Sequence, residues 1–183
     1  MKKLIFAIAA AALISACGGS DSVQPVENTA PKKVNPRAAI WIPTEILFKK
    51  GAPVATNIKT ECGLPEKFST YIKLASDQAG VAVYRASKGA DINKDRLVIE
   101  IVNAVSSGNA FIGHRKYAKA EGALYKNGKK IGSFTSGRVS GGGAFGGFKG
   151  SCQVLDRVIK VMGRDIAQWL KNPANGAILG DNL

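Results

Sequence analysis

The stretch from Met1 to Cys17, MKKLIFAIAAAALISAC, constrains this chain most, because it decides which part folds and in which compartment. Two lysines precede an apolar stretch from Leu4 to Ile14, and small residues follow it. This order is typical of a secretory signal, and the apolar stretch is too short to remain as a permanent membrane-spanning helix. We therefore expect residues 1–16 to be removed as a signal peptide during export.

The run Ile14-Ser15-Ala16-Cys17 resembles the lipobox of bacterial lipoproteins, in which a dedicated signal peptidase cleaves before a diacylated cysteine. The resemblance implies that Cys17 becomes the lipidated first residue, whose palmitate-type acyl chains hold the protein in a membrane. By the same resemblance, Gly18 in place of an aspartate favours the outer membrane and its periplasmic face. The alternative is an ordinary signal peptide in which Cys17 is incidental.

The segment 17–37 is rich in Gly, Ser, Pro, Asn and charge, and it shows no apolar period. Such a segment cannot bury enough surface to offset the entropy lost on ordering, so we expect a lipidated flexible tether. The folded domain then spans residues 38–172, the usual size of one domain with one core. Residues 173–183 form a C-terminal tail.

Two cysteines, Cys62 and Cys152, remain once Cys17 is lipidated. An even pair in an oxidising compartment predicts a disulfide, and both cysteines precede or open a predicted helix. The bond would close a loop of about ninety residues and, in the chain-entropy model, stabilise the fold by about 4 kcal/mol. A reactive thiol at a helix N-terminus is the alternative, although no C-x-x-C pair supports redox chemistry.

The first half of the domain predicts strands and one helix. Residues 38–48 are apolar enough for a strand, which Pro43 places at a sheet edge or bulge because proline donates no backbone hydrogen bond. The helix begins around Cys62 to Pro65 and carries an apolar face of Leu64, Phe68, Tyr71, Ile72 and Ala75. Residues 81–86 form a short strand. The next strand is well buried, with one face made of Leu97, Ile99, Ile101 and Val105.

The second half predicts a hairpin and a long helix. Asn127-Gly128 is a strong hairpin signal, and it joins strands at 115–126 and 129–139. After a glycine-rich run comes an amphipathic helix with the apolar stripe Leu155, Val158, Ile159, Met162, Ile166, Trp169 and Leu170. Two one-sided helices and a strand meander must cover each other. They predict an α+β two-layer sandwich, in which a mostly antiparallel sheet of four to five strands packs against two helices.

The formal net charge of the chain is +13, and the chain stays strongly basic after loss of the signal. An exported, tethered chain meets anionic lipid, lipopolysaccharide and peptidoglycan, so we expect the charge to face these polymers and not nucleic acid. The candidate ligand-binding residues lie along the predicted hairpin: Lys116, Lys119, Lys126, Lys129, Lys130 and Arg138. A basic solvated surface without a dedicated ligand is the alternative.

The run from Ser140 to Cys152, SGGGAFGGFKGSC, contains a formal match to the dinucleotide fingerprint G-x-G-x-x-G. That fingerprint needs a second parallel strand after the helix, with an acidic residue further on, and we expect the chain to end without one. A P-loop needs Gly-Lys followed by Ser or Thr, whereas Phe148 precedes Lys149 here. We therefore interpret the run as a connector and predict no cofactor.

Few residues offer chemistry. His114 is the single histidine and falls in a predicted loop, so no set of metal ligands with recognisable spacing can be drawn, and no nucleophile-elbow sequence is present. Glu100 and Glu121 could lie on neighbouring strands, but strand carboxylates usually act as solvated partners of lysines such as Lys119. We expect no enzymatic activity, no catalytic residue and no metal.

The segment from Glu121 to Leu170 resembles a pattern of small bacterial envelope lipoproteins of unassigned function, in which a hairpin strand ends in a Ser/Gly-rich turn before a final amphipathic helix. The plan is similar to the helix-plus-meander domains of outer-membrane accessory proteins, such as the N-terminal domain of TolB. The resemblance implies an accessory or assembly role through an envelope protein partner. A binding module for anionic lipopolysaccharide or peptidoglycan is the alternative.

Overall fold

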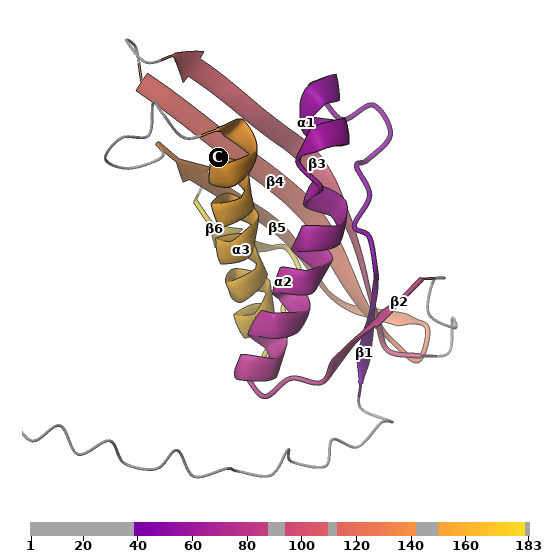
Figure 1. Cartoon of the computed structure of the whole chain (residues 1–183). Helices are drawn as coiled ribbons and strands as arrows, with labels where there is room; N and C mark the ends of the chain where they lie inside the picture. The colour runs from indigo at the N-terminus through magenta and orange to yellow at the C-terminus, as the bar shows by residue number, and fades with distance from the viewer. Residues whose placement is uncertain (1–38, 88–93, 110–112, 142–149, 182–183) are drawn as a thin grey trace, which may run out of the picture. The chain divides into compact units, whose positions relative to one another are not determined.

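The computed structural model describes residues 39–87, 94–109, 113–141 and 150–181, and the statements below refer to this part of the chain. Every described residue belongs to one compact unit within residues 33–183. Its elements, shown in Figure 1, are β1 (Ile40–Pro43), α1 (Thr56–Glu61), α2 (Leu64–Gln78), β2 (Val83–Ala86), β3 (Arg96–Asn109), β4 (Gly113–Lys126), β5 (Lys129–Ser140), α3 (Ser151–Trp169) and β6 (Ala177–Gly180).

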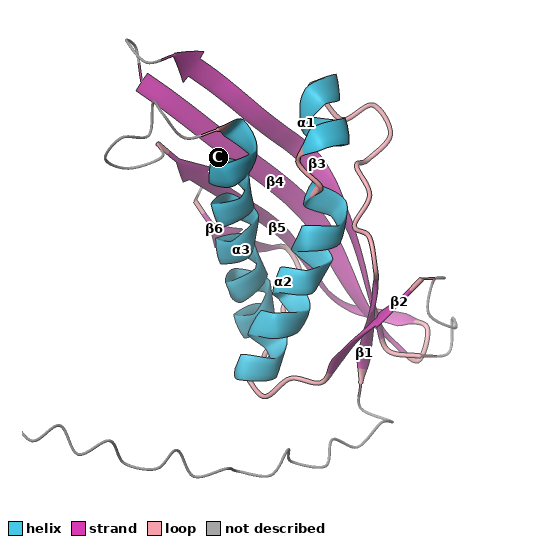
Figure 2. Cartoon of the chain, viewed as in Figure 1, coloured by secondary structure: helices cyan, strands magenta, loops and turns pink. Residues whose placement is uncertain are grey.

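The strands form one mixed sheet in the order β2-β1-β3-β4-β5-β6. The long central strands β3, β4 and β5 are antiparallel neighbours, whereas β1, β2 and β6 pair in parallel. Helices α2 and α3 pack together on one face of this sheet (Figure 2). The predicted two-layer α+β sandwich is therefore confirmed, with six strands and three helices in place of four to five strands and two helices.

The hairpin between β4 and β5 has the turn that its sequence predicts. Asn127 and Gly128 connect the strands with φ angles of 47° and 76°. Positive φ at both positions is the type I′ geometry, whose twist matches that of the flanking strands and which Asn-Gly adopts at little cost. The hairpin signal is thus confirmed, and it sets the register that pairs Lys126 with Lys129.

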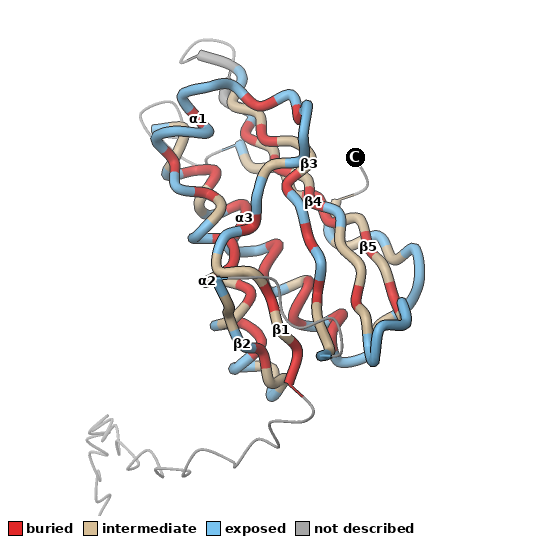
Figure 3. Tube along the Cα trace, turned by 90° about the vertical axis from the view of Figure 1, so that its right-hand side faces the viewer, coloured by how far each residue is buried: buried red, intermediate tan, exposed pale blue. Residues whose placement is uncertain are grey.

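Helices α2 and α3 begin and end as expected. Gly63 precedes α2 with φ 59°, Pro65 lies in its first turn, and Gly80 follows it with φ 74°. Glycine adopts this left-handed conformation readily, because it lacks the β-carbon that makes the conformation unfavourable for other residues. The apolar stripe of α3 is buried throughout, from Leu155 at 0% exposure to Leu170 at 6%. One core therefore joins both helices to the sheet (Figure 3).

The predicted disulfide is present. Cys62 lies between α1 and α2, Cys152 lies in the first turn of α3, and their Cα atoms are 4.8 Å apart. Both cysteines belong to or pack against the core. The bond therefore links the N-terminal ends of the two covering helices, which are 90 residues apart in the chain.

The edge position predicted for residues 38–48 is wrong, because β1 lies between β2 and β3 inside the sheet. Pro43 is the last residue of β1, so its missing N–H interrupts no ladder. Beyond it the chain stays beside β3, where Phe48 forms a bridge with Ile101 and Val54 with Ala104. Position at the strand end, and not at the sheet edge, accommodates the proline.

The face predicted for Val105 is also wrong. A register shift between Ile101 and Asn103 inserts an extra residue into β3 opposite β4. Since side chains alternate with period two, one extra residue moves every later side chain to the other face. Ala104 is therefore 1% exposed within the core, and Val105 is only half-buried.

Two elements lie where the sequence predicts none. The segment between the predicted strand at 38–48 and the helix that begins around Cys62 contains the short helix α1, which buries Ile58. The tail beyond Pro173 contains β6, which pairs in parallel with β5 from Phe134 to Gly137. Both are short and cover existing apolar surface, so their own patterns are too weak to be read in isolation.

Candidate functional site: the uncovered face of the sheet

The two faces of the sheet differ in what covers them. On β4, Ala118, Ala120 and Leu124 are at most 1% exposed beneath the helices, whereas the alternating residues Tyr117 and Lys119 are half-buried. Figures 1 and 2 show α2 and α3 on one side only. No described helix lies over the opposite side, which we call the uncovered face.

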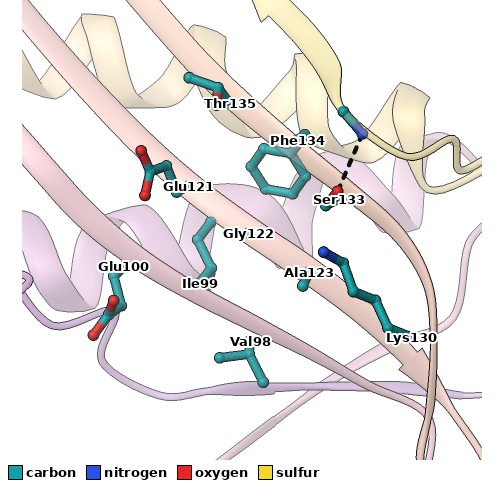
Figure 4. A pocket seen from close by; sticks show the side chains of 11 residues that line it. Val98, Ile99, Glu100, Glu121, Gly122, Ala123, Lys130, Ser133, Phe134 and Thr135 are labelled. Atoms are coloured by element: carbon teal, nitrogen blue, oxygen red, sulfur yellow. Dashed lines mark hydrogen bonds between the residues drawn. The ribbon is translucent and has the colours of Figure 1, made fainter.

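A shallow depression of about 350 Å³ lies at the centre of the uncovered face (Figure 4). Glu100 of β3 and Glu121 of β4, its register partner, border it at one end, and Lys130 of β5 borders it at the other. The prediction that the two glutamates lie on neighbouring strands is therefore confirmed. Glu121 pairs with Lys49, whose Nζ is 3.1 Å from Oε2, so its carboxylate serves an exposed ion pair.

A second depression, of about 310 Å³, lies further along the same face. It is lined by Val105 of β3, by Tyr117 and Arg115 of β4, and by Val139 of β5. Partial burial raises the pKa of the Tyr117 hydroxyl, because the charged form is poorly solvated there. The uncovered face thus combines apolar hollows with charged borders, a composition typical of a docking surface.

An aromatic–cationic row, which the sequence did not predict, crosses one end of the uncovered face. We define it by the strand-to-strand register partners Tyr84, Trp41, Arg96, Tyr125 and Lys130, taken from β2, β1, β3, β4 and β5 in turn. The rings of Trp41 and Tyr84 stack with centroids 5.4 Å apart. The Arg96 guanidinium lies 5.0 Å from the Tyr125 ring. No pattern along one strand reveals it, because it exists only across strands.

The predicted ligand-binding cations do not form one surface. Lys126, Lys129 and Lys130 are exposed near the hairpin turn, and Lys119 is half-buried on the uncovered face. Lys116 is 3% exposed on the opposite side of β4, which contradicts its predicted role on an open surface. Its position in the sequence carried the signal, since it shares the period-two phase of the buried residues Ala118 and Ala120.

Arg138 is likewise not an open cation. Its Nε and Nη2 donate to Asp165 of α3 at 2.8 and 2.9 Å, and its Nη1 donates to Asp181 at 3.1 Å. The hydrogen bond and charge of Asp165, followed by the charge of Asp181, raise the pKa of the guanidinium against the lowering effect of burial. Two carboxylates hold this side chain within the fold, and its predicted ligand contact stays a prediction.

A hollow of about 490 Å³ lies on the covered side, between α1, β3, β4 and the start of α3. Lys116 lines it together with Ser106 and Ser151, whose hydroxyl oxygens are 2.6 Å apart. We assign no ligand to it.

The topological reason given for rejecting a nucleotide site is wrong. β6 does follow α3, runs parallel to β5 and is followed by the acidic residue Asp181. Yet the carboxylate of Asp181 accepts hydrogen bonds from Arg138 and from the backbone N–H of Val139. The acidic side chain is therefore occupied within the fold. The glycine-rich connector at 142–149 lies outside the described residues.

The other residues considered for catalysis or metal binding form no such site among the described residues. His114 lies in β4, paired with Gly108, and not in a loop as predicted. Within the described ranges no group of three or more His, Cys, Asp or Glu side chains could hold a metal ion. Nor is any described helix long and apolar enough to cross a membrane. Cys17 and the tether lie outside the described residues.

No protein-family model matches the chain, and no curated protein matches it. Three similar solved structures are the PelC dodecamer of Paraburkholderia phytofirmans (9% identity, TM-score 0.45, 74% of this chain and 93% of that one), a minor lipoprotein of Acinetobacter baumannii (12%, 0.37, 73% and 87%) and lipoprotein GNA1162 of Neisseria meningitidis (17%, 0.41, 72% and 99%). Bacterial lipoproteins thus stand among the structural neighbours. At such identities and TM-scores the likeness carries no argument about function.

Proposed function

We propose that this protein is a lipid-anchored lipoprotein of the bacterial outer membrane, facing the periplasm, with a non-enzymatic accessory or assembly role. It acts by docking an envelope protein on the uncovered face of its sheet. The more specific resemblance to the N-terminal domain of TolB stays a prediction.

The uncovered face is the observation that carries this proposal. The helices bury one side of the sheet, and the other side keeps two depressions bordered by Val98 and Tyr117. Val98 is 48% exposed on β3, one of the two longest strands, in the interior of the sheet. An antiparallel sheet can leave one face in water, but that face then usually alternates to polar residues. Exposed apolar side chains at its centre favour a partner surface.

The proposed location rests on two observations that agree. The leader and the lipobox-like run before Cys17 predict export and lipidation. The disulfide between Cys62 and Cys152 is the kind of bond that persists in oxidising compartments such as the periplasm. Both indicate a chain that leaves the cytoplasm.

The proposal is tested by site-specific photo-crosslinking of the lipidated protein in its native envelope. A photoreactive residue replaces Val98 or Tyr117 on the uncovered face, and Gln168, exposed on α3, serves as the matched control. We expect a discrete protein adduct from the two sheet positions, resistant to high salt, and none from Gln168. Equal adducts at all three positions, or no protein adduct from the sheet, would contradict docking through this face.

A basic module for an anionic envelope polymer is the second candidate. It is favoured by one observation, the exposure of Lys126, Lys129 and Lys130 around a single turn. Lipopolysaccharide or peptidoglycan captured by the protein at low salt and released at high salt would support it, because screening weakens contacts between exposed charges. Retention of a protein partner at high salt would support the first candidate instead.

A further inference from the structure

The aromatic–cationic row lies at the end of the sheet where the described chain begins. Trp41 is two residues beyond Ala39, the first described residue, and its backbone N–H donates to Asp95 just before β3. Lys94 lies over the Trp41 ring, with Nζ 4.7 Å from the centroid. The row thus brings aromatic rings and cations from five strands to the end of the sheet where the described chain begins.

The hairpin turn adds charge at the same end. Lys126, Lys129 and Lys130 are all exposed, and Tyr125, next to them on β4, is the register partner of both Arg96 and Lys130. The half-buried Asp95 is the nearest described carboxylate in sequence to the row. The balance at this end is therefore strongly positive, with Tyr84 41% exposed among the cations.

Aromatic rings interleaved with cations are suited to contact with a membrane surface. Tyr and Trp rings are amphipathic and favour the boundary between water and lipid, where one part of the ring is apolar and the other is wet. Lysine and arginine near an anionic membrane each contribute favourable binding energy that salt weakens. A surface that interleaves both kinds of residue suits the headgroup layer of an anionic phospholipid membrane.

The position of the row decides between a membrane and a soluble polymer. A flexible tether of about twenty residues has a root-mean-square reach of about 25 Å, so the predicted segment 17–37 would keep this end of the domain near the bilayer. A lipid anchor is reinforced by a second, protein-borne membrane contact. The part of the domain nearest the anchor is the part that carries the aromatic and basic residues.

We propose that the aromatic–cationic row, with Lys94, Lys126 and Lys129 beside it, is a membrane-contact site that binds anionic phospholipid and holds the tethered domain against the bilayer. The site lies at one end of the uncovered face. It shares Lys130 with the first depression, whereas the second depression, beside Val105 and Tyr117, lies outside it. The inference relies on the proposed lipid anchor only for the reach of the tether.

The test uses the polypeptide from Gly18 to Leu183, which lacks Cys17 and therefore its predicted acyl chains, so that vesicle binding reports the protein surface alone. Vesicles contain phosphatidylethanolamine with phosphatidylglycerol, or phosphatidylcholine only. We expect salt-sensitive binding to the anionic vesicles and quenching of tryptophan fluorescence by brominated lipid. The quenching reports Trp41, since the other tryptophan, Trp169, is 6% exposed in the core.

Two charge-matched variants give the decisive comparison. The double variant Lys126→Glu/Lys130→Glu should bind anionic vesicles at least about tenfold more weakly, since two cations at the surface become anions. The control Lys59→Glu/Arg157→Glu changes the same net charge at exposed positions of α1 and α3, and should lose less than about threefold. Thermal unfolding checks that both variants stay folded.

Four outcomes would overturn the inference: no binding to anionic vesicles, equal losses in the two variants, binding without quenching of Trp41, or preference for purified lipopolysaccharide or peptidoglycan over vesicles. The last would reassign the row to an envelope glycan. Because this assay contains no partner protein, its failure leaves the crosslinking test of the uncovered face intact, and the reverse also holds.

Discussion

The two faces of the sheet differ in how far their side chains are buried, and adjacent residues of β3 show this difference. Leu97 points toward the helices and is 1% exposed, whereas Val98 points away and is 48% exposed. On the covered side Arg85 is held within the fold, where it donates to the Ser69 hydroxyl and the Thr44 carbonyl. The uncovered side instead carries rings and cations that face solvent. The covered face therefore specifies the fold, and the uncovered face is available to bind.

Packing on the covered side leaves little freedom. A β-carbon added at Gly122 would lie 2.5 Å from the ring of Phe134, its register partner on β5. That ring meets Trp169 of α3 in an edge-to-face contact with centroids 4.8 Å apart. Glycine at this position lets an aromatic ring fill the space between strand and helix.

Removal of the disulfide should have the largest effect on the covered side. The double variant Cys62→Ala/Cys152→Ala loses a cross-link across 90 residues and is expected to unfold with a free energy lower by about 4 kcal/mol. Urea unfolding followed by circular dichroism measures it. A loss below about 1 kcal/mol would mean that the unlinked helices already hold their places on the sheet.

The next test compares neighbouring side chains on one strand. Leu97→Ala removes a fully buried side chain and should cost about 2–5 kcal/mol, because the cavity collapses only in part. Val98→Ala, on the uncovered face, should change the free energy of unfolding by less than about 1 kcal/mol. Both are measured by urea unfolding of otherwise identical chains. Equal losses would show that something covers Val98 in the free protein.

Removing either of two ion-paired cations, Arg138 or Lys49, should change the free energy of unfolding by a smaller amount. Arg138→Ala breaks a two-pronged contact to Asp165 and a further one to Asp181, and should cost about 1–2 kcal/mol after allowance for its partial exposure. Lys49→Ala breaks the exposed pair with Glu121 and should cost less than about 0.5 kcal/mol. Double-mutant cycles with Asp165→Ala and Glu121→Ala isolate the two coupling energies. A larger coupling energy for Lys49–Glu121 than for Arg138–Asp165 would contradict this prediction.

The smallest effect concerns alkaline pH. The Tyr71 hydroxyl donates to Asp156 at 2.8 Å, and burial, followed by this hydrogen bond and the charge of Asp156, raises its pKa to about 12. A raised pKa favours the protonated form in the folded state. This contribution is therefore complete below pH 10 and falls as the pH rises toward 12.

The free energy of unfolding of the Tyr71→Phe variant should fall less steeply between pH 10 and pH 12 than that of the unchanged protein. Asp156→Asn, which removes the neighbouring charge, serves as the intermediate case. Identical pH profiles for all three proteins would indicate that Tyr71 does not titrate differently on unfolding. Circular dichroism in urea at each pH provides the measurement.

Local patterns in the sequence predicted most of the elements. The Asn127-Gly128 turn, the apolar stripes of α2 and α3, and the cysteine pair each depend on neighbours in the chain or on simple pairing rules, so they could be read directly. The carboxylates Glu100 and Glu121 were rightly placed on adjacent strands. These features need no knowledge of which strand lies beside which.

The errors share a different cause. Lys116 follows the same alternation as other strand residues, but which phase faces the helices depends on the whole assembly. The extra residue between Ile101 and Asn103 reverses that phase within one strand, and Val105 was misplaced because of it. The short strand β6 exists only because β5 offers it an edge.

The sequence by itself determined the cysteine pair, the helices α2 and α3 and the central hairpin, because the helices and the hairpin depend on local conformational preference and the cysteines on a simple pairing rule. Tertiary structure decided the order of the strands, the buried position of Lys116, the ion pairs of Arg138, and the row that joins Trp41 to Tyr125. These depend on contacts between distant segments, since a sheet brings together residues that no local period relates. The surfaces proposed here for binding belong to this second class.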